Sequence, residues 1–136
     1  MINHITLFVS DLAASKKFFA NSLQPLGYKI IEEDSAAEEG ERWVGLAIHD
    51  VQGQRDVWIK ERKDTKPSGS LSCLAFTAAS KDMVNKFYQA GLEAGGTDNG
   101  PPGYRPKYWA DYYAAFVLDP DGNNIEVVFD DRAVKN

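Results

Sequence analysis

The chain has very little cysteine and no excess of positive charge, and both shortages exclude whole classes of protein. Cys73 is the only cysteine among 136 residues, so no disulfide can form within the chain, and a reducing compartment is expected. Lys and Arg number 15 against 20 Asp and Glu, which gives a formal net charge of −5. Because no basic run offsets this charge, we expect no nucleic-acid partner.

Long hydrophobic runs are missing as well. No apolar stretch approaches the roughly 18 residues that a membrane span requires. The first residues show neither the basic nor the apolar region of a signal peptide. We therefore expect a cytoplasmic protein with no membrane partner. Aromatic residues, in contrast, are plentiful: 7 Phe, 6 Tyr and 3 Trp provide the core volume for one domain.

Strand and helix patterns follow the same order in the two halves of the chain. The first half has strand patterns at 2–9, 28–33, 43–48 and 56–61, with a helix at 11–24. The second half has a strand at 71–78, a helix at 80–94, a weak strand at 96–99 and a closing hairpin at 112–129. Segments 62–70 and 100–110 are predicted to be a linker and a loop. Ser10 or Asp11 caps the first helix, and Ser80 caps the second.

The two halves also match residue by residue. An ungapped shift of 69 residues aligns Phe18 with Phe87 and Gly27 with Gly96, at equivalent points of two β-α-β-β-β units. We therefore predict an α+β fold built from two βαβββ modules, at about 1–66 and 70–130. Their mixed sheets would curve around one central cleft, with the helices on the outer side.

The last strand carries a single carboxylate. Residues 125–129 are apolar except for Glu126. Alternate side chains of a strand face opposite sides, so Glu126 points away from the core that Ile125 and Val127 would join. A carboxylate in mid-strand needs solvent, a cation partner or a metal ion.

The turn before that strand predicts which residues share the face of Glu126. Residues 119–122, Asp-Pro-Asp-Gly, have the composition of a tight turn. If Asp119 pairs with Gly122, Ala115 lies opposite Glu126. Tyr113 then shares the face of Glu126 and is predicted to line the cleft.

Two segments carry a resemblance to a known family: His-Ile-Thr-Leu-Phe-Val-Ser-Asp-Leu at 4–12 and Asp-Pro-Asp-Gly-Asn-Asn-Ile-Glu at 119–126. With these motifs the sequence resembles the vicinal oxygen chelate superfamily, which includes glyoxalase I, bleomycin-resistance proteins and extradiol dioxygenases. The resemblance extends over nearly the whole chain. It implies two modules around a cupped sheet. In metal-using members it also implies a divalent cation held by about one side chain from each of four equivalent strands.

The resemblance places candidate metal ligands at His4 on the first strand and at Glu126 on the last. Cys73 stands where relatives usually carry histidine. A thiolate there would favour Zn²⁺ or Fe²⁺, whereas oxygen and nitrogen ligands suit Mn²⁺ or Ni²⁺. Each residue also has an ordinary structural interpretation: a hydrogen-bonded histidine, a carboxylate paired with a lysine, or an inert core cysteine.

The fourth ligand position is lost. The shift of 69 places Val57 where relatives often carry glutamate, and a one-residue gap would place Asp56 or Trp58 there instead. This ligand count predicts weak divalent-metal binding or none. Trp58 would then wall the pocket or belong to the core.

Further substrate-binding residues are expected around Glu126. Asn124 shares its face, and the aromatic and basic loop 101–109 offers Arg105 and Lys107 to an anionic substrate. Ordinary surface charges are the alternative for this loop. Trp58 and Tyr113 complete the candidate set of substrate-binding residues.

Three functions remain open. The first is a lyase, isomerase or dioxygenase acting on a substrate with adjacent oxygens, with Glu126 as the catalytic residue, either with or without a divalent metal ion. The second is a metal-free pocket that binds a small molecule or drug without catalysis. The third is a dimeric module with no small-molecule role. A homodimer is expected in each case, because the open sheet edges need cover.

Overall fold

A computed structural model describes residues 2–34, 36–52, 55–63, 73–130 and 132 of the chain. None of the helices among these residues has the length and apolar character needed to cross a membrane. The first half contains β1 (Ile5–Val9), α1 (Leu12–Ser22), the short 3₁₀ helix η1 (Gln24–Leu26), β2 (Lys29–Asp34), β3 (Trp43–Ala47) and β4 (Val57–Glu61). The second half contains β5 (Leu74–Thr77), α2 (Lys81–Glu93), β6 (Thr97–Tyr104), β7 (Tyr112–Leu118) and β8 (Asn124–Asp130).

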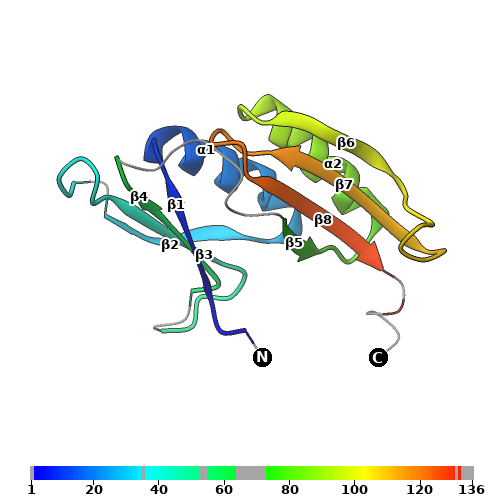
Figure 1. Cartoon of the computed structure of the whole chain (residues 1–136). Helices are drawn as coiled ribbons and strands as arrows, with labels where there is room; N and C mark the ends of the chain where they lie inside the picture. Colours follow the sequence, from blue (N-terminus) through cyan, green and yellow to red (C-terminus); the bar gives the residue numbers. More distant parts are fainter. Residues whose placement is uncertain (1, 35, 53–54, 64–72, 131, 133–136) are drawn as a thin grey trace.

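The two halves form two four-stranded sheets with the same topology (Figure 1). Their strand orders are β1-β4-β3-β2 and β5-β8-β7-β6. The β1–β4 and β5–β8 pairs are parallel, and all other neighbouring strands in the two sheets are antiparallel. This arrangement confirms the predicted α+β fold with two βαβββ modules. The predicted junction between them, near 66–70, lies outside the described residues.

The two helices begin at predicted caps and cover one core. Asp11 accepts a hydrogen bond from the Ala14 N–H at 3.2 Å, and Ser80 accepts one from the Met83 N–H at 3.3 Å. These side chains satisfy donors that have no partner inside a helix. A single cluster of buried side chains spans both modules, and it includes Phe18 from α1 and Phe87 from α2.

The core requires a glycine where the modules meet. A Cβ atom on Gly96 would lie 2.5 Å from Val117 and 2.7 Å from Phe18, closer than real contacts allow. Gly96 therefore lets a residue of the first module approach the β6–β7 strands. Its match in the repeat, Gly27, has a different reason to be glycine, since its φ is +96°.

The predicted loop at 100–110 is partly wrong. Strand β6 continues to Tyr104 and pairs with β7, with register shifts around Gly100. Pro101 and Pro102 suggested a loop because proline cannot donate a ladder hydrogen bond. They are accommodated because β6 is an edge strand with irregular pairing.

Candidate functional site

Glu126 lies in the middle of β8 with only 6% of its surface exposed. Its neighbours Ile125 and Val127 are fully buried in the core on the other face. The alternation predicted from the sequence is therefore confirmed, and the carboxylate belongs to the face of the sheet opposite the core. Here we call this the inner face of the β5–β8 sheet.

Two proton donors hold the Glu126 carboxylate. The hydroxyl of Tyr112 donates to Oε1, and the thiol of Cys73 donates to Oε2 at 3.3 Å. Cys73 as a residue is exposed, so it is not the core cysteine of the structural interpretation. Partial burial of its thiol against the sheet nevertheless raises its pKa to about 12, with further contributions from its hydrogen bond to Glu126 and the charge of that carboxylate. Burial, followed by the same partner, also raises the pKa of Tyr112. Both donors thus keep their protons at neutral pH, and Glu126 is the acceptor of the group.

The sequence prediction does not include Tyr112, because the predicted hairpin register is wrong by one residue. Asp119 pairs with Asn123 rather than Gly122, donating its N–H to the Asn123 carbonyl at 2.9 Å. Gly122, with φ of 85°, is the third residue of a three-residue loop. Phe116, not Ala115, consequently lies opposite Glu126.

This slip of one residue exchanges two tyrosines between the faces of the sheet. Tyr112 shares the face of Glu126. Tyr113, predicted to line the cleft, packs against the core instead, and its hydroxyl donates to Asn85 on α2 at 2.7 Å. The signal that could have identified Tyr112 is the glycine at the third loop position, which favours the three-residue turn.

Arg105 and Asn124 come together beside this group. Both line a hollow of about 260 Å³ that also includes Phe116, the cross-strand partner of Glu126. The side chain of Asn124 accepts a hydrogen bond from Asn99 at 3.1 Å. The structure thus brings two predicted substrate-binding residues to the inner face that carries Glu126.

Trp58 occupies the position in the first module that corresponds to Glu126. Ile5 pairs with Val57 as Leu74 pairs with Ile125, so the next residues, Trp58 and Glu126, are equivalent. The ungapped shift of 69 is therefore wrong by one residue at β4, and the alternative with a one-residue gap, which placed Trp58 at this position, is correct. Val57 is buried, with 3% of its surface exposed. Trp58 packs edge-to-face on Trp43, with ring centroids 5.3 Å apart.

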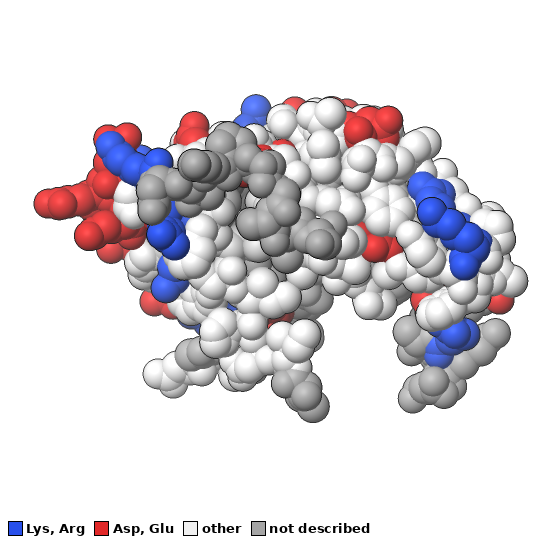
Figure 2. Space-filling view, in the orientation of Figure 1, with Lys and Arg blue, Asp and Glu red and all other residues white. Residues whose placement is uncertain are grey.

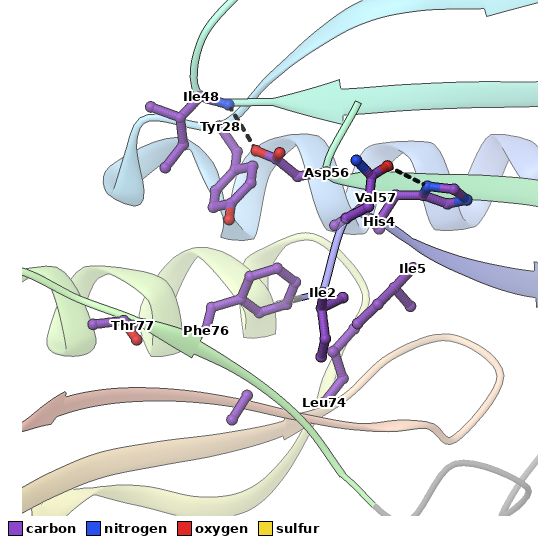
Figure 3. Close-up of a pocket in the computed structure, with 12 residues that line it drawn as sticks. Ile2, His4, Ile5, Tyr28, Ile48, Asp56, Val57, Leu74, Phe76 and Thr77 are labelled. Carbon is purple, nitrogen blue, oxygen red and sulfur yellow. Dashed lines mark hydrogen bonds between the residues drawn. The ribbon is translucent and has the colours of Figure 1, made fainter. Parts of the chain in front are cut away.

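His4 lies one residue before β1, at a different hollow (Figure 3). This hollow, of about 400 Å³, lies between the start of the first module and β5, and Glu126 is not among its lining residues. Tyr28 and Phe76 meet across it, with ring centroids 5.4 Å apart. The imidazole Nδ1 of His4 is 2.8 Å from the Asn3 side-chain oxygen.

The predicted metal ligands therefore do not form one group. Cys73 and Glu126 are in contact, but no group of three or more His, Cys, Asp or Glu side chains able to hold a metal ion exists among the described residues. A zinc site normally has three or four protein ligands, and a coordinating cysteine must lose its proton. With the raised pKa of Cys73, the donors described in one chain do not fit a divalent-cation site.

Comparison with known proteins agrees with the fold and with the sequence motifs. Residues 1–127 match the family model "Glyoxalase/Bleomycin resistance protein/Dioxygenase superfamily". The chain is 33% identical over 135 residues to the "Uncharacterized protein YqjT" of Bacillus subtilis (strain 168), covering 93% of this chain and 97% of that protein.

Comparison with solved structures also finds proteins of this fold. A glyoxalase/bleomycin resistance protein from Albidiferax ferrireducens T118 is 28% identical, with a TM-score of 0.75 over 96% of this chain and 98% of that one. A glyoxalase I mutant from Zea mays is 21% identical, with a TM-score of 0.74, over 97% of this chain but 47% of that one. The maize protein is thus similar in fold and about twice as long.

Proposed function

Because the chain belongs to the glyoxalase/bleomycin resistance protein/dioxygenase superfamily, we propose that it is a small-molecule enzyme of isomerase or lyase type. Its substrate would carry adjacent oxygens, and Glu126 would be the group that moves a proton. The observation that carries the proposal is the Glu126 carboxylate, buried in mid-strand on the inner face and held by Tyr112 and Cys73.

The chemistry follows from the protonation states of this group. Glu126 takes a proton from a substrate carbon that bears a hydroxyl and adjoins a carbonyl. The C–H electrons then move onto the carbonyl oxygen, giving an enediolate. Once Glu126 has taken the proton, the Tyr112 hydroxyl turns from Oε1 and donates its hydrogen bond to that oxygen. Return of the proton from Glu126 to the neighbouring carbon, together with transfer of the substrate's hydroxyl proton to the oxygen on that carbon, completes an isomerisation that needs no other reactant. General base catalysis of this kind typically contributes about 10²–10⁴-fold to a rate.

A divalent cation such as Zn²⁺, Mn²⁺, Ni²⁺ or Fe²⁺ is implied by the metal-using branches of the family. Among the described residues proposed as ligands, however, only Glu126 and Cys73 lie together, and Cys73 is held as a thiol. We therefore expect one chain to bind such an ion weakly at most.

The proposed assembly is a homodimer. Each sheet has two edge strands. Strands β2 and β6 have irregular pairing, which discourages further strands, whereas the pairing of β1 and β5 is regular. In the described part of the chain, β1 and β5 each pair with a single strand, so they offer edges for a second copy. Sedimentation at micromolar concentration should give the mass of two chains, and a monomer throughout would rule this assembly out.

The enzymatic proposal is tested by proton exchange. A panel of small hydroxy-carbonyl compounds is incubated with the protein in D₂O, and loss of the C–H signal is followed by NMR. We expect exchange with at least one compound and loss of that exchange in Glu126→Gln. A matched control, Glu93→Gln, changes an exposed carboxylate on α2 that interacts with Gln89. Exchange that persists in Glu126→Gln, or no exchange with any compound, would refute the proposal.

The second candidate is a binding protein without catalysis. It is favoured by the aromatic pair Trp43 and Trp58, because Trp58 occupies the position equivalent to Glu126. An indole there can stack on a planar ligand but can neither coordinate a metal nor move a proton. Under this function, ligand binding would quench tryptophan fluorescence. Neither the native protein nor Glu126→Gln would change the ligand chemically.

A further inference from the structure

A second group of polar and aromatic side chains lies on the inner face beside Glu126. It lines the hollow of about 260 Å³ and consists of Asn99, Arg105, Lys107, Tyr108, Phe116 and Asn124. Phe116 lies directly across from Glu126, and Asn124 precedes Glu126 by two residues on the same face of β8. Two residues of a strand span about 7 Å. The hollow is therefore within the length of a small organic acid from the Glu126 carboxylate.

Two basic side chains reach this hollow in an otherwise acidic protein. The guanidinium of Arg105 lies over Phe116, 5.6 Å from the ring centroid, and the ammonium of Lys107 lies 5.2 Å from the centroid of Tyr108. Figure 2 shows Lys and Arg atoms gathered on the right of the molecule, over the ends of β6 and β7. The chain as a whole carries a net charge of −5, so positive charge here is a local feature.

Hydrogen bonds fix the Arg105 side chain at the rim. Its Nη2 donates to the Pro101 carbonyl at 2.7 Å, and its backbone N–H donates to the Tyr112 carbonyl at 2.7 Å. A guanidinium carries five N–H donors, so the bond to Pro101 orients the group while leaving most of its capacity for another acceptor. The planar donor fork of arginine matches the oxygens of a carboxylate or phosphate.

Neutral donors complete the hollow. Asn99 and Asn124 line it together, joined by the 3.1 Å hydrogen bond from Asn99 to Asn124. Side-chain amides can donate to the oxygens of an anion without adding charge. Glu126, in contrast, repels negative charge, so an anionic group is favoured at the Arg105 end of the inner face and disfavoured at the Glu126 end.

We propose that this hollow binds the anionic group of the substrate, a carboxylate or phosphate on a small hydroxy-carbonyl compound. Arg105 and Lys107 bind the anion, Phe116 packs against the carbon skeleton, and the reacting carbon reaches Glu126. The inference rests on the proposed function, because it orients a substrate for proton transfer at that carboxylate. It narrows the substrate class to small hydroxy-carbonyl acids or phosphate esters.

The test uses three probes: glycolate, inorganic phosphate and the neutral amide glycolamide. Binding to the full chain is followed by ¹H–¹⁵N NMR at the side-chain amides of Asn99 and Asn124. Both anions should shift these signals, and glycolamide should not. If glycolate binds more tightly, the substrate class is a carboxylic acid; if phosphate does, it is a phosphate ester.

Variants show whether Arg105 carries the binding. Arg105→Gln should weaken the binding of the anions about tenfold or more, because it removes a charge-assisted hydrogen bond. Lys86→Gln, which removes an exposed charge paired with Asp82 on α2, is the matched control and should leave the dissociation constants unchanged. Equal binding of glycolamide, no effect of Arg105→Gln, or no shift with either anion would overturn the inference.

The outcome is separable from that of the proposed function. Glu126→Gln should abolish proton exchange yet keep anion binding, or tighten it, because a repelling charge is removed. If Arg105→Gln leaves proton exchange and its Michaelis constant unchanged, the anion site is wrong although the enzymatic proposal survives. If the anions bind but no compound exchanges its C–H proton, the anion site is supported and the enzymatic proposal is refuted.

Discussion

The carboxylate of Asp121, in the turn between β7 and β8, accepts hydrogen bonds from both the backbone N–H and the hydroxyl of Ser10, between β1 and α1. The N–H bond is 3.0 Å long, and Asp121 is 4% exposed. These residues are 111 positions apart and belong to different modules. The turn motif therefore does more than reverse the chain, because it fastens the second module to the first.

This contact predicts a specific loss of stability. Asp121→Ala removes two hydrogen bonds to a buried carboxylate, and we expect the free energy of unfolding to fall by about 1–3 kcal/mol. Denaturant unfolding followed by tryptophan fluorescence measures it. The matched control is Asp50→Ala, since Asp50 is the exposed residue that the 69-residue shift aligns with the second-module turn. It should change stability by less than about 0.5 kcal/mol. Equal effects of the two substitutions would contradict the fastening role.

The titration of Cys73 provides a second prediction. Its pKa of about 12 means that the reactive thiolate is scarce at pH 8. Alkylation by iodoacetamide should therefore be slow, and its rate should still be rising above pH 10. Glu126→Gln removes a negative charge beside the thiol, so the pKa should fall and alkylation at pH 8 should become faster. Because Cys73 is the only cysteine, mass spectrometry gives its rate directly.

The control for this experiment is Glu93→Gln, which should alkylate at the rate of the unmodified chain. A pH–rate profile with a midpoint near the ordinary thiol value, unchanged in Glu126→Gln, would show that the two side chains do not interact.

Metal binding provides a third prediction. Calorimetric titration of chelator-treated protein with Zn²⁺, Mn²⁺ and Ni²⁺ should detect weak binding at most. The reason is that Glu126 and a protonated Cys73 are fewer ligands than a stable site needs. The same titration is repeated with Cys73→Ala and Glu126→Gln. Tight stoichiometric binding that both substitutions abolish would show that Cys73 is a thiolate ligand. It would contradict this prediction and favour a metalloenzyme.

The sequence was sufficient for the fold and for the position of Glu126, for physical reasons. Helix caps, glycine positions and the alternation around Glu126 are local signals, and the repeat displays the caps and the glycines twice. The face of Glu126 follows from Ile125 and Val127 alone, because a strand has a period of two.

The residues around Glu126 were less predictable, because they depend on pairing between strands. Choosing Gly122 rather than Asn123 as the partner of Asp119 shifted β7 by one residue and exchanged Tyr112 with Tyr113. A single-residue gap likewise made Trp58, not Val57, the equivalent of Glu126. Gly122 favours the three-residue loop, but the gap before β4 leaves no comparable signal in the sequence. The anion site had a partial signal, since Arg105 and Lys107 are visible in the sequence, but their common hollow depends on β6 continuing to Tyr104.

The two neighbouring tyrosines provide the most direct test of the central claim, that Glu126 works with Tyr112 on the inner face. The measurement is the rate of C–H to C–D exchange for a compound that the native protein turns over. We predict that Glu126→Gln lowers this rate by at least about 100-fold, because it removes the base that accepts the proton. Tyr112→Phe should lower it by about tenfold, because it removes a hydrogen bond to the substrate oxygen. Tyr113→Phe, whose hydroxyl bonds Asn85 on the helix side, should leave the rate unchanged. A rate that falls in Tyr113→Phe but not in Tyr112→Phe would contradict this account.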